Sequence, residues 1–249
     1  MPGRRSKRCR AIVLDRTKLR EQDLILTTLS LGGEQLRAVA KGARKPGSRL
    51  AASTGLFCDV DLLVSEGRGL PIVTEAQLIK GHAGLCLDLD ALSCASAICE
   101  VARMTCYEDV EDPFLHPLLA RTLDACDQAI DRAHLDAVYA AYTFKVLSHC
   151  GWRPVLNTCV SCGEQGGTRF CTLAGGVLCE SCAKDVEGAM PIETWQVEWI
   201  GALVGLTFDQ IMGAEIDQST AGFLSSVAYE WATTHLDCRL RASEFFTGA

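Results

Sequence analysis

Aromatic residues are scarce in the first part of the chain, and long apolar runs are missing from all of it. Phe57 is the only aromatic residue before Tyr107. Proteins that bind single strands by stacking bases need several aromatic side chains, so stacking cannot supply most of the affinity for a nucleic acid. The apolar run from Ala11 to Leu14 is too short for a signal peptide, and no stretch approaches the roughly 18 apolar residues of a membrane helix. We therefore expect a cytoplasmic protein without a membrane span.

Common enzyme motifs are also missing. The chain has no G-x-x-x-x-G-K-[ST] phosphate loop, no H-E-x-x-H and no G-x-S-x-G. Two acidic clusters, at 88–90 and 108–112, could gather a metal for nuclease chemistry, but they flank expected helices, where acidic residues serve as caps. The histidines are scattered, which is more typical of core and surface positions than of catalytic bases: His82, His116, His134, His149 and His235. We predict that the protein is not an enzyme.

Charge is divided unevenly along the chain. Residues 1–80 carry 15 Lys and Arg against 8 Asp and Glu, a net charge of +7, whereas the whole chain carries −7. The other residues therefore carry −14. Such asymmetry predicts two domains, a basic one at 1–80 and an acidic one at 81–249.

The basic part consists of short runs separated by turns. Strands are expected at 10–16, 22–31, 34–41, 56–65 and 71–79. A Gly-Gly pair at 32–33 supplies the positive φ angles of a tight hairpin. Leu62 and Val64 should face a core, and Asp59 and Asp61, which alternate with them, should face water. Five short strands in about 70 residues fit a small all-β barrel, and the OB-fold is the commonest choice.

Beyond residue 81 the apolar pattern changes to a helical period. One apolar stripe covers 115–130 and is preceded by Asp112 as an N-cap. A second stripe covers 135–146 and is followed by Gly151, a residue suited to ending a helix. Residues 88–107 and 219–238 are also expected to be helical. The acidic part is therefore predicted to be an all-α domain, interrupted between about 155 and 188.

Two C-x-x-C pairs lie in this interruption: Cys159 with Cys162, and Cys179 with Cys182. Each C-x-x-C turn presents two thiolates to one metal ion, and two turns complete the sulfur tetrahedron that zinc prefers. The length between the pairs lies in the range of such zinc sites. Because four protein ligands leave no open coordination position, we predict one structural Zn²⁺ without a catalytic role.

Other interpretations of the cysteines stay open at this point. A thioredoxin-like redox pair would follow a strand in a β-α-β unit, which the pattern does not show. An iron–sulfur cluster or four unliganded thiols are the remaining alternatives, and either Cys150 or Cys171 could substitute as a ligand. Since no export signal is present, disulfides are not expected. Four cysteines among apolar residues are predicted to be core residues: Cys94, Cys99, Cys106 and Cys126.

The first 49 residues hold 13 Lys and Arg against 4 Asp and Glu. Arg37 and Lys41 share one face of the third expected strand. The loop that follows is expected to be flexible and rich in exposed main-chain amides, which suit phosphate oxygens. We predict contacts with a nucleic acid that depend on phosphates, are largely independent of sequence and weaken steeply with salt. A solvated basic surface is the alternative. The candidate residues for these contacts are Arg37, Lys41, Arg44, Lys45 and Arg49.

Taken in order, these features resemble the RecO family of bacterial DNA repair and recombination proteins. The resemblance spans almost the whole chain. The stretches that carry it are Ala11–Leu14, Asp23–Ile25, Leu36–Lys45, Gly67–Pro71, Thr74–Ala76, and Gly151 through the four cysteines, with Gly175-Gly176 before the second pair.

The resemblance implies an N-terminal OB-fold followed by a helical domain with an inserted zinc element. It also implies that the protein binds ssDNA and dsDNA, anneals complementary strands, and works with RecR to load RecA onto DNA covered by single-strand-binding protein (SSB). These are activities of the RecFOR pathway, in the nucleoid of the bacterial cytoplasm. DNA contact carries over to the basic loop and zinc ligation to the four cysteines, although some family members lack that cysteine set. The acidic, apolar C-terminal tail of SSB would dock on the helical domain, where three basic residues are candidates: Arg121, Arg132 and Lys145.

A different class of function is the alternative. A zinc-ribbon and OB-fold adaptor of the transcription or translation machinery would use its barrel on RNA. Acceleration of DNA annealing would support the first hypothesis, and binding of RNA alone without annealing would support the second.

Overall fold

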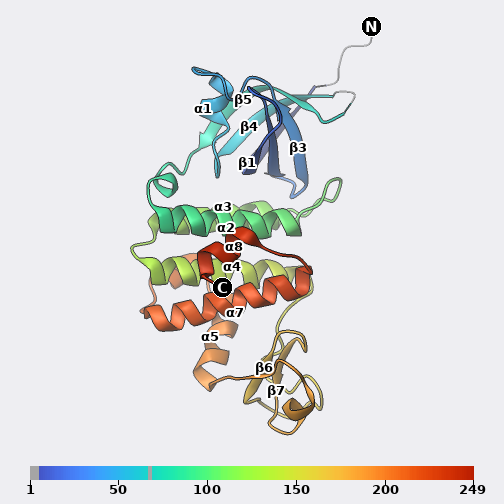
Figure 1. Ribbon diagram of the computed structural model, residues 1–249, viewed down its shortest axis with the longest axis vertical. Coiled ribbons are helices and arrows are strands. Elements are labelled where there is room, and N and C mark those ends of the chain that lie inside the picture. The colour runs from blue at the N-terminus through green and yellow to red at the C-terminus, as the bar shows by residue number, and fades with distance from the viewer. Residues whose placement is uncertain (1–5, 67–68) are drawn as a thin grey trace. The chain divides into compact units, whose positions relative to one another are not determined.

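A computed structural model describes residues 6–66 and 69–249 of the protein (Figure 1). Arg4, Arg5 and the Gly67-Arg68 part of the family resemblance lie outside the described residues. The chain forms two compact units, Met1–Asp127 and Gln128–Ala249, and each is described by itself. Across the described residues, no helix combines the length and apolar character needed to span a bilayer.

The first unit contains a sheet followed by two long helices. Its elements are β1 (Ser6–Lys18), β2 (Leu24–Ser30), β3 (Gln35–Ala40), α1 (Arg49–Ser53), β4 (Asp59–Ser65), β5 (Ile72–Lys80), the 3-10 turn η1 (Gly84–Cys86), α2 (Leu89–Thr105) and α3 (Leu115–Gln128). The five strands form a closed barrel in the order β1-β2-β3-β5-β4. β1 is long enough to pair with β4 through its first half and with β2 through its second. All pairs are antiparallel except β3 with β5.

Alternation along the strands directs one set of side chains into the barrel. The core residues are Val13, Leu24, Leu26, Ala38, Ala40, Ala43, Val60, Leu62, Val64 and Val73. The expected five strands and the inward orientation of Leu62 and Val64 are therefore confirmed. The outward orientation of Asp59 was wrong, because this side chain is buried. The guanidinium of Arg10 on β1 donates to both carboxylate oxygens of Asp59, at 2.7–3.2 Å, and so compensates its loss of water.

The helices of the first unit are fastened to the barrel at the β2–β3 hairpin. Gly33 in the hairpin lies so close to the α2–α3 connection that a Cβ atom would be 1.8 Å from the carbonyl oxygen of Asp112. The side-chain amide of Gln35 donates to the carbonyl oxygens of Arg103 and Cys106, at 3.0 and 3.1 Å, and so satisfies carbonyl groups at the C-terminal end of α2. The β2–β3 hairpin of the barrel thus contacts both the end of α2 and the connection that leads to α3.

The second unit is mainly helical. Its elements are α4 (Arg132–His149), β6 (Arg169–Cys171), β7 (Gly176–Leu178), η2 (Cys182–Asp185), β8 (Met190–Pro191), α5 (Thr194–Gly205), α6 (Phe208–Met212), α7 (Gln218–Leu236) and α8 (Arg241–Thr247). α4 and α7 pack side by side (Figure 1). α4 is buried around most of its circumference, including Leu135, Tyr139, Tyr142 and Val146, and Gly151 ends it with a φ of 97°.

The long helices expected from the apolar period are confirmed within about two residues at most ends, a typical uncertainty of helix ends. The chain is therefore a sheet-rich region followed by a helical one. Asp88 caps α2 by accepting from the amide of Ala91 at 2.8 Å, as acidic residues at helix starts do. The cysteines expected in cores are buried. The expected stripe at 115–130 ends early, because α3 stops at Gln128 and Ile130 is exposed.

Candidate metal centre and basic surface

The four cysteines of the two C-x-x-C pairs meet at one point of the second unit. Their sulfur atoms all lie within 4.8 Å of one another, and those of Cys162 and Cys179 are 3.8 Å apart. A tetrahedron with metal–sulfur bonds of about 2.3 Å has sulfur–sulfur edges of about 3.8 Å. The cluster therefore has the donor set and the size to hold one metal ion.

Short turns place the sulfur atoms. The amide of Gly163 donates to the carbonyl oxygen of Cys159 at 2.9 Å, and Gly163 has a φ of 78°, which closes the first turn. In the second turn the amide of Ala183 donates to the carbonyl oxygen of Cys179 at 3.0 Å. Between the turns β6 and β7 form the hairpin expected from Gly175-Gly176. The two C-x-x-C turns thus place two pairs of thiols opposite each other.

The thiols differ in their ease of ionisation. Backbone hydrogen bonds from Cys179 and Cys162 lower the pKa of Cys159 to about 6. A backbone hydrogen bond from Cys182 also acts on Cys179, but burial and the neighbouring thiols outweigh it and raise the pKa of Cys179 to about 12. Several thiolates in one cluster repel each other unless a cation compensates them. The chemistry of the site therefore fits a divalent, thiophilic ion.

Two nearby cysteines do not join this group. Cys171 is buried beneath it, packed with Cys159 and Leu178, and its thiol donates to the carbonyl oxygen of Glu187 at 3.6 Å. Cys150 follows the end of α4. Within the described residues, the cluster suited to a metal contains only the four cysteines of the two pairs.

Aromatic contacts join the cysteine-bearing segment to the helices of the same unit. The ring of Phe170 on β6 lies 5.7 Å from that of Trp231 on α7, measured between centroids. The indole nitrogen of Trp231 donates to the carbonyl oxygen of Trp152 at 3.0 Å, and the ring of Trp152 stacks on His235 at 4.7 Å. A metal ion that orders the two turns would therefore also stabilise the packing of this segment on α7.

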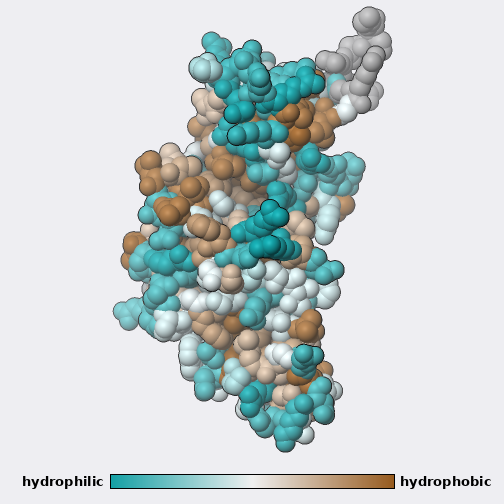
Figure 2. Space-filling model, in the orientation of Figure 1, coloured by the Kyte–Doolittle hydropathy of each residue, from teal (hydrophilic) through white to brown (hydrophobic). Residues whose placement is uncertain are grey.

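The predicted DNA-binding residues lie on β3, in the loop that follows it and at the start of α1. Arg37 is exposed on β3, Lys41 follows that strand, and Arg49 begins α1. Arg44 and Lys45 are exposed between them. Figure 2 shows hydrophilic side chains gathered over the end of the barrel that carries α1. These five exposed cations are called the basic surface from here on: Arg37, Lys41, Arg44, Lys45 and Arg49.

The main chain of this loop differs from expectation. Its amides at residues 42–45 and 48 donate inside the protein, for example from Gly42 to the Asp23 carboxylate at 2.8 Å and from Arg44 to the carbonyl oxygen of Gln22 at 3.0 Å. The expectation of freely exposed amides was wrong, because turns and the β1–β2 loop use them. Side chains, not amides, are left to contact phosphates.

The same hydrogen bonds show that further cations lie near this loop, which the sequence pattern did not predict. Arg44 donates to the carbonyl oxygens of Arg20 and Glu21, at 3.5 and 2.7 Å, so the β1–β2 loop lies against the basic surface. Arg20 on this loop and Lys18 at the end of β1 are exposed. The signal for this arrangement was Asp23, a short carboxylate suited to capping a turn.

Two arginines in the first half of β1 form ion pairs with acidic residues. Arg8 pairs with Asp61 at 2.9 Å and with Glu75 at 3.5 Å, and Arg10 pairs with Asp59. These pairs cancel charge locally. The basic surface, in contrast, forms no ion pair with a carboxylate of the described residues.

Three basic residues were candidates for binding the C-terminal tail of SSB, and two of them already bind groups of the protein itself. Lys145 donates to the carbonyl oxygens of Val204 and Leu206 at the end of α5, at 2.9 and 2.5 Å, and burial lowers its pKa. Arg132 pairs with Asp136 at 3.2 Å and donates to the carbonyl oxygen of Phe246. Arg121, in contrast, is exposed on α3.

Comparisons with known proteins agree across nearly the full length. Residues 4–82 match the family model described as "Recombination protein O N terminal", and residues 86–244 match "Recombination protein O C terminal". The chain is 30% identical over 237 residues to the "DNA repair protein RecO" of Desulforudis audaxviator, covering 94% of each chain. It is 31% identical over 238 residues to the protein of the same name from Bifidobacterium adolescentis, covering 93% of this chain and 95% of the relative.

Proposed function

Because the chain belongs to the RecO family, we propose that it is a DNA repair and homologous recombination mediator, not an enzyme. It binds ssDNA and dsDNA and anneals complementary strands. The observation that carries this proposal is the basic surface, whose five exposed cations have no carboxylate partner among the described residues. Unpaired surface cations release counterions from DNA on binding, which supplies affinity that does not depend on sequence.

We assign the barrel to the OB-fold, on the basis of its five strands and their order. Residues 1–80 then form the DNA-binding domain, and residues 81–249 the helical domain that carries the zinc element at about 155–188. Phe57, the one aromatic residue of the barrel region, is buried, so bases have no aromatic platform there. Affinity comes from phosphates, and base pairing between the strands supplies the specificity.

The positive charge of the protein can accelerate annealing without any covalent reaction. Two single strands repel each other through their phosphates, and a cationic surface that neutralises part of both lowers this repulsion. The net charge of +7 on residues 1–80 suits this role. The net charge of −14 on residues 81–249 disfavours DNA and favours protein partners.

The partners of the proposed function are RecR, the C-terminal tail of SSB and, indirectly, RecA. The protein and RecR would help to load RecA onto SSB-coated ssDNA, in the nucleoid of the bacterial cytoplasm. The names of the relatives and the family models support the assignment to DNA repair and recombination.

The four-cysteine cluster holds one structural Zn²⁺ in this proposal, with Cys159, Cys162, Cys179 and Cys182 as ligands. The ion would cross-link the two turns and leave no position for substrate. The small apolar core around Cys171 and Leu178 is too small to order the segment alone, so the metal supplies much of its stability.

An annealing assay tests the function. Complementary labelled DNA strands should anneal faster with the protein, and a triple variant Lys41→Ala, Lys45→Ala, Arg49→Ala should lose most of this acceleration. A matched control, Arg153→Ala with Lys184→Ala, removes exposed cations of the helical domain and should keep it. Binding of RNA without any annealing of DNA would instead favour an RNA adaptor and reject the proposal.

A further inference from the structure

The connection between α2 and α3 exposes three large apolar side chains within a short stretch of the first unit (Figure 1). Tyr107 is 61% exposed, Val110 52% and Phe114 41%. Grouped apolar side chains on a surface favour a binding role, whereas isolated ones are common. Residues 107–114 also contain four acidic residues and no Lys or Arg. This stretch, residues 107–114, is called the acidic loop below.

The barrel holds both ends of the acidic loop. The carbonyl oxygen of Tyr107 accepts from the amide of Gln35 at 2.9 Å, and the amide of Asp112 donates to the carbonyl oxygen of Gly32 at 2.9 Å. Between these two hydrogen bonds Asp109 has a φ of 61°, a left-handed conformation that turns the chain. A loop held in one conformation loses little entropy when it binds a partner, which favours its use as a docking element.

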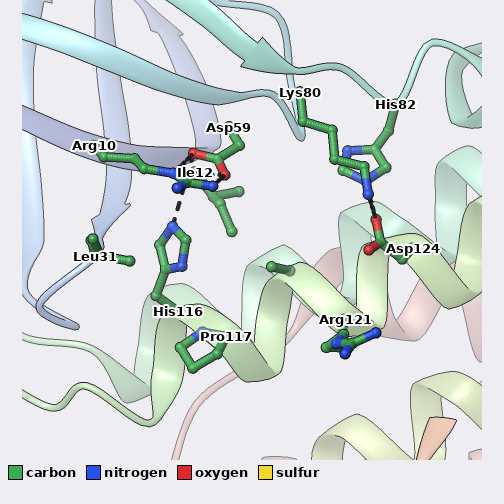
Figure 3. Close-up of a pocket in the computed structure, with 11 residues that line it drawn as sticks. Arg10, Ile12, Leu31, Asp59, Lys80, His82, His116, Pro117, Arg121 and Asp124 are labelled. Carbon is green, nitrogen blue, oxygen red and sulfur yellow. Dashed lines mark hydrogen bonds and ion pairs between the residues drawn. The ribbon is translucent and has the colours of Figure 1, made fainter.

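The acidic side chains in the middle of the loop carry uncompensated charge. Three of them are exposed and form no ion pair with any described residue: Glu108, Asp109 and Glu111. Other acids of the first unit have basic partners. Asp59 pairs with Arg10 at 2.7 Å. Asp124 pairs with Lys80, and Figure 3 shows both pairs. A cationic partner would therefore gain ion pairs with the acidic loop without breaking existing ones.

The basic surface offers complementary features. Four of its cations lie within residues 41–49, and none pairs with a carboxylate of the described residues. Leu19, which is 44% exposed, adds apolar area nearby. It lies close to these cations because the guanidinium of Arg44 donates to the carbonyl oxygens of the next two residues, Arg20 and Glu21. The aliphatic stems and charged ends of lysine and arginine also suit the ring of Tyr107.

The acidic loop lies too far from these cations to pair with them in its own molecule. Gln35, which holds one end of the loop, begins β3, and Lys41 directly follows the end of that strand. Since a strand rises about 3.3 Å per residue, the two positions are about 20 Å apart. Over residues 6–66 and 69–249, no ion pair joins the loop to the basic surface. A second molecule, in contrast, can bring the two surfaces together.

We propose that the acidic loop of one molecule docks on the basic surface of a second copy of this chain. The contact is head-to-tail, so each end of a pair keeps one unused surface and further copies can add. The net charge of −7 on each molecule opposes association, so the contact is weak and depends on this local match. DNA would compete for the same cations, and this consequence alone rests on the proposed function.

Sedimentation velocity of the full chain tests the contact, with the protein itself as the probe. The wild type should form assemblies larger than a monomer at about 50 mM salt and dissociate at about 500 mM, because salt screens the ion pairs. A loop variant, Glu108→Gln with Glu111→Gln, should associate about tenfold more weakly. A matched control, Glu198→Gln with Glu215→Gln, removes two exposed acids of the second unit and should associate as the wild type does.

Mixing two variants tests the head-to-tail arrangement. A surface variant, Lys41→Ala with Lys45→Ala and Arg49→Ala, keeps its acidic loop, whereas the loop variant keeps its basic surface. Each should stay monomeric alone at concentrations at which the wild type associates. Together they should form a one-to-one dimer and nothing larger. The intact loop of the surface variant binds the intact surface of the loop variant, and no second intact pair is left for a third molecule.

Annealing of complementary DNA is measured for the same proteins, so that this inference and the proposed function fail separately. The loop variant should anneal DNA at least as fast as the wild type, and a short single-stranded oligonucleotide should dissociate wild-type assemblies. A wild type that is monomeric at both salt concentrations overturns the inference. So does equal association of the loop variant and the control, a mixture that stays monomeric, or an assembly that persists with DNA bound. A wild type that associates as expected but does not anneal DNA would reject the DNA function alone.

Discussion

The guanidinium of Arg44 donates to the main-chain carbonyl oxygen of Glu21 at 2.7 Å, across two loops of the barrel. The main-chain amide of Arg44 donates to the next carbonyl oxygen, that of Gln22, at 3.0 Å. One residue therefore ties the loop after β3 to the loop after β1 by side chain and backbone together. These bonds fix the two loops relative to each other, which would lower the entropy lost in the proposed binding of DNA.

Arg44 should therefore affect both stability and DNA binding, unlike its neighbours. Arg44→Ala is expected to lower the free energy of unfolding by about 1 kcal/mol, because it removes hydrogen bonds from a charged donor at a solvent-exposed site. Lys41→Ala and Lys45→Ala should weaken DNA binding and reduce the slope of log K against log salt by about 1 each. Urea denaturation and salt-dependent binding measure the two effects. Equal stability losses for all three variants would contradict the proposed tie.

Gly33 should tolerate no side chain. It has a φ of 90°, and a Cβ atom would collide with the carbonyl group of Asp112. Gly33→Ala is therefore expected to destabilise the protein by about 3 kcal/mol or more, through strain and a displaced connection. Gly47 is the matched control, since its φ is 73° with nothing within 4 Å of a Cβ. Gly47→Ala should cost only about 1 kcal/mol, so similar melting temperatures for the two variants would argue against the packing of the hairpin on α2–α3.

Cys159→Ser and Cys179→Ser should each abolish stoichiometric zinc, because each removes one of four ligands. Zinc content is measured by elemental analysis of the purified protein. Hydrogen exchange should then rise across residues 155–191 and stay unchanged in the barrel. Cys150→Ser is the control, since this cysteine lies outside the cluster, and it should retain one zinc. Full zinc content in Cys179→Ser would show that the ligand set is different.

Stability should fall as the pH drops below about 6.5, in part through His116. Burial lowers the pKa of His116, an effect that Asp59 opposes and Arg10 reinforces. The unfolded chain therefore binds a proton at a pH where the folded protein does not, so acid favours unfolding until the folded histidine is also protonated. His116→Gln should reduce the stability difference between pH 7.5 and pH 5.5 by about 1 kcal/mol. An unchanged difference, measured by chemical denaturation at both pH values, would reject this role.

A fragment that ends at Asp127 should fold, whereas one that ends at Lys80 should be much less stable. The shorter fragment lacks Asp124, the partner of Lys80, and the α2 carbonyl groups that Gln35 satisfies. It would also expose barrel groups that α2 and α3 cover. Thermal unfolding by circular dichroism distinguishes the two, and a Lys80 fragment as stable as the longer one would show that the barrel is independent.

The strands, the long helices and the meeting of the cysteines could be predicted because each depends on local spacing. Period-two alternation placed Leu62 and Val64 in the barrel, and the C-x-x-C turns placed two thiols on each side of one point. The short helices α5, α6 and α8 were missed. α6 and α8 are too brief to show a helical period, and the apolar residues of α5 are spread around the whole helix, so no apolar stripe marks it.

Contacts between distant residues could not be predicted. Asp59 was expected to face solvent because it alternates with apolar residues along its strand. Its burial depends on Arg10, which lies on another strand and compensates its charge. Similarly, Arg132 and Lys145 looked available for a partner, since nothing local shows that Phe246 and Val204 accept their hydrogen bonds. A count of charged residues therefore predicts the charge of a surface only when residues that bind other groups of the same protein are left out.

The ring of strands has one short contact. β3 and β5 meet through only two residue pairs, Val39 with Ile72 and Ala40 with Val73, while every other neighbour pair is longer. Because this contact directly precedes Lys41, thermal fluctuations that unzip the barrel should begin beside the basic surface. If DNA binds at this surface as proposed, it would contact the least paired part of the barrel, where a local change in shape breaks the fewest strand hydrogen bonds.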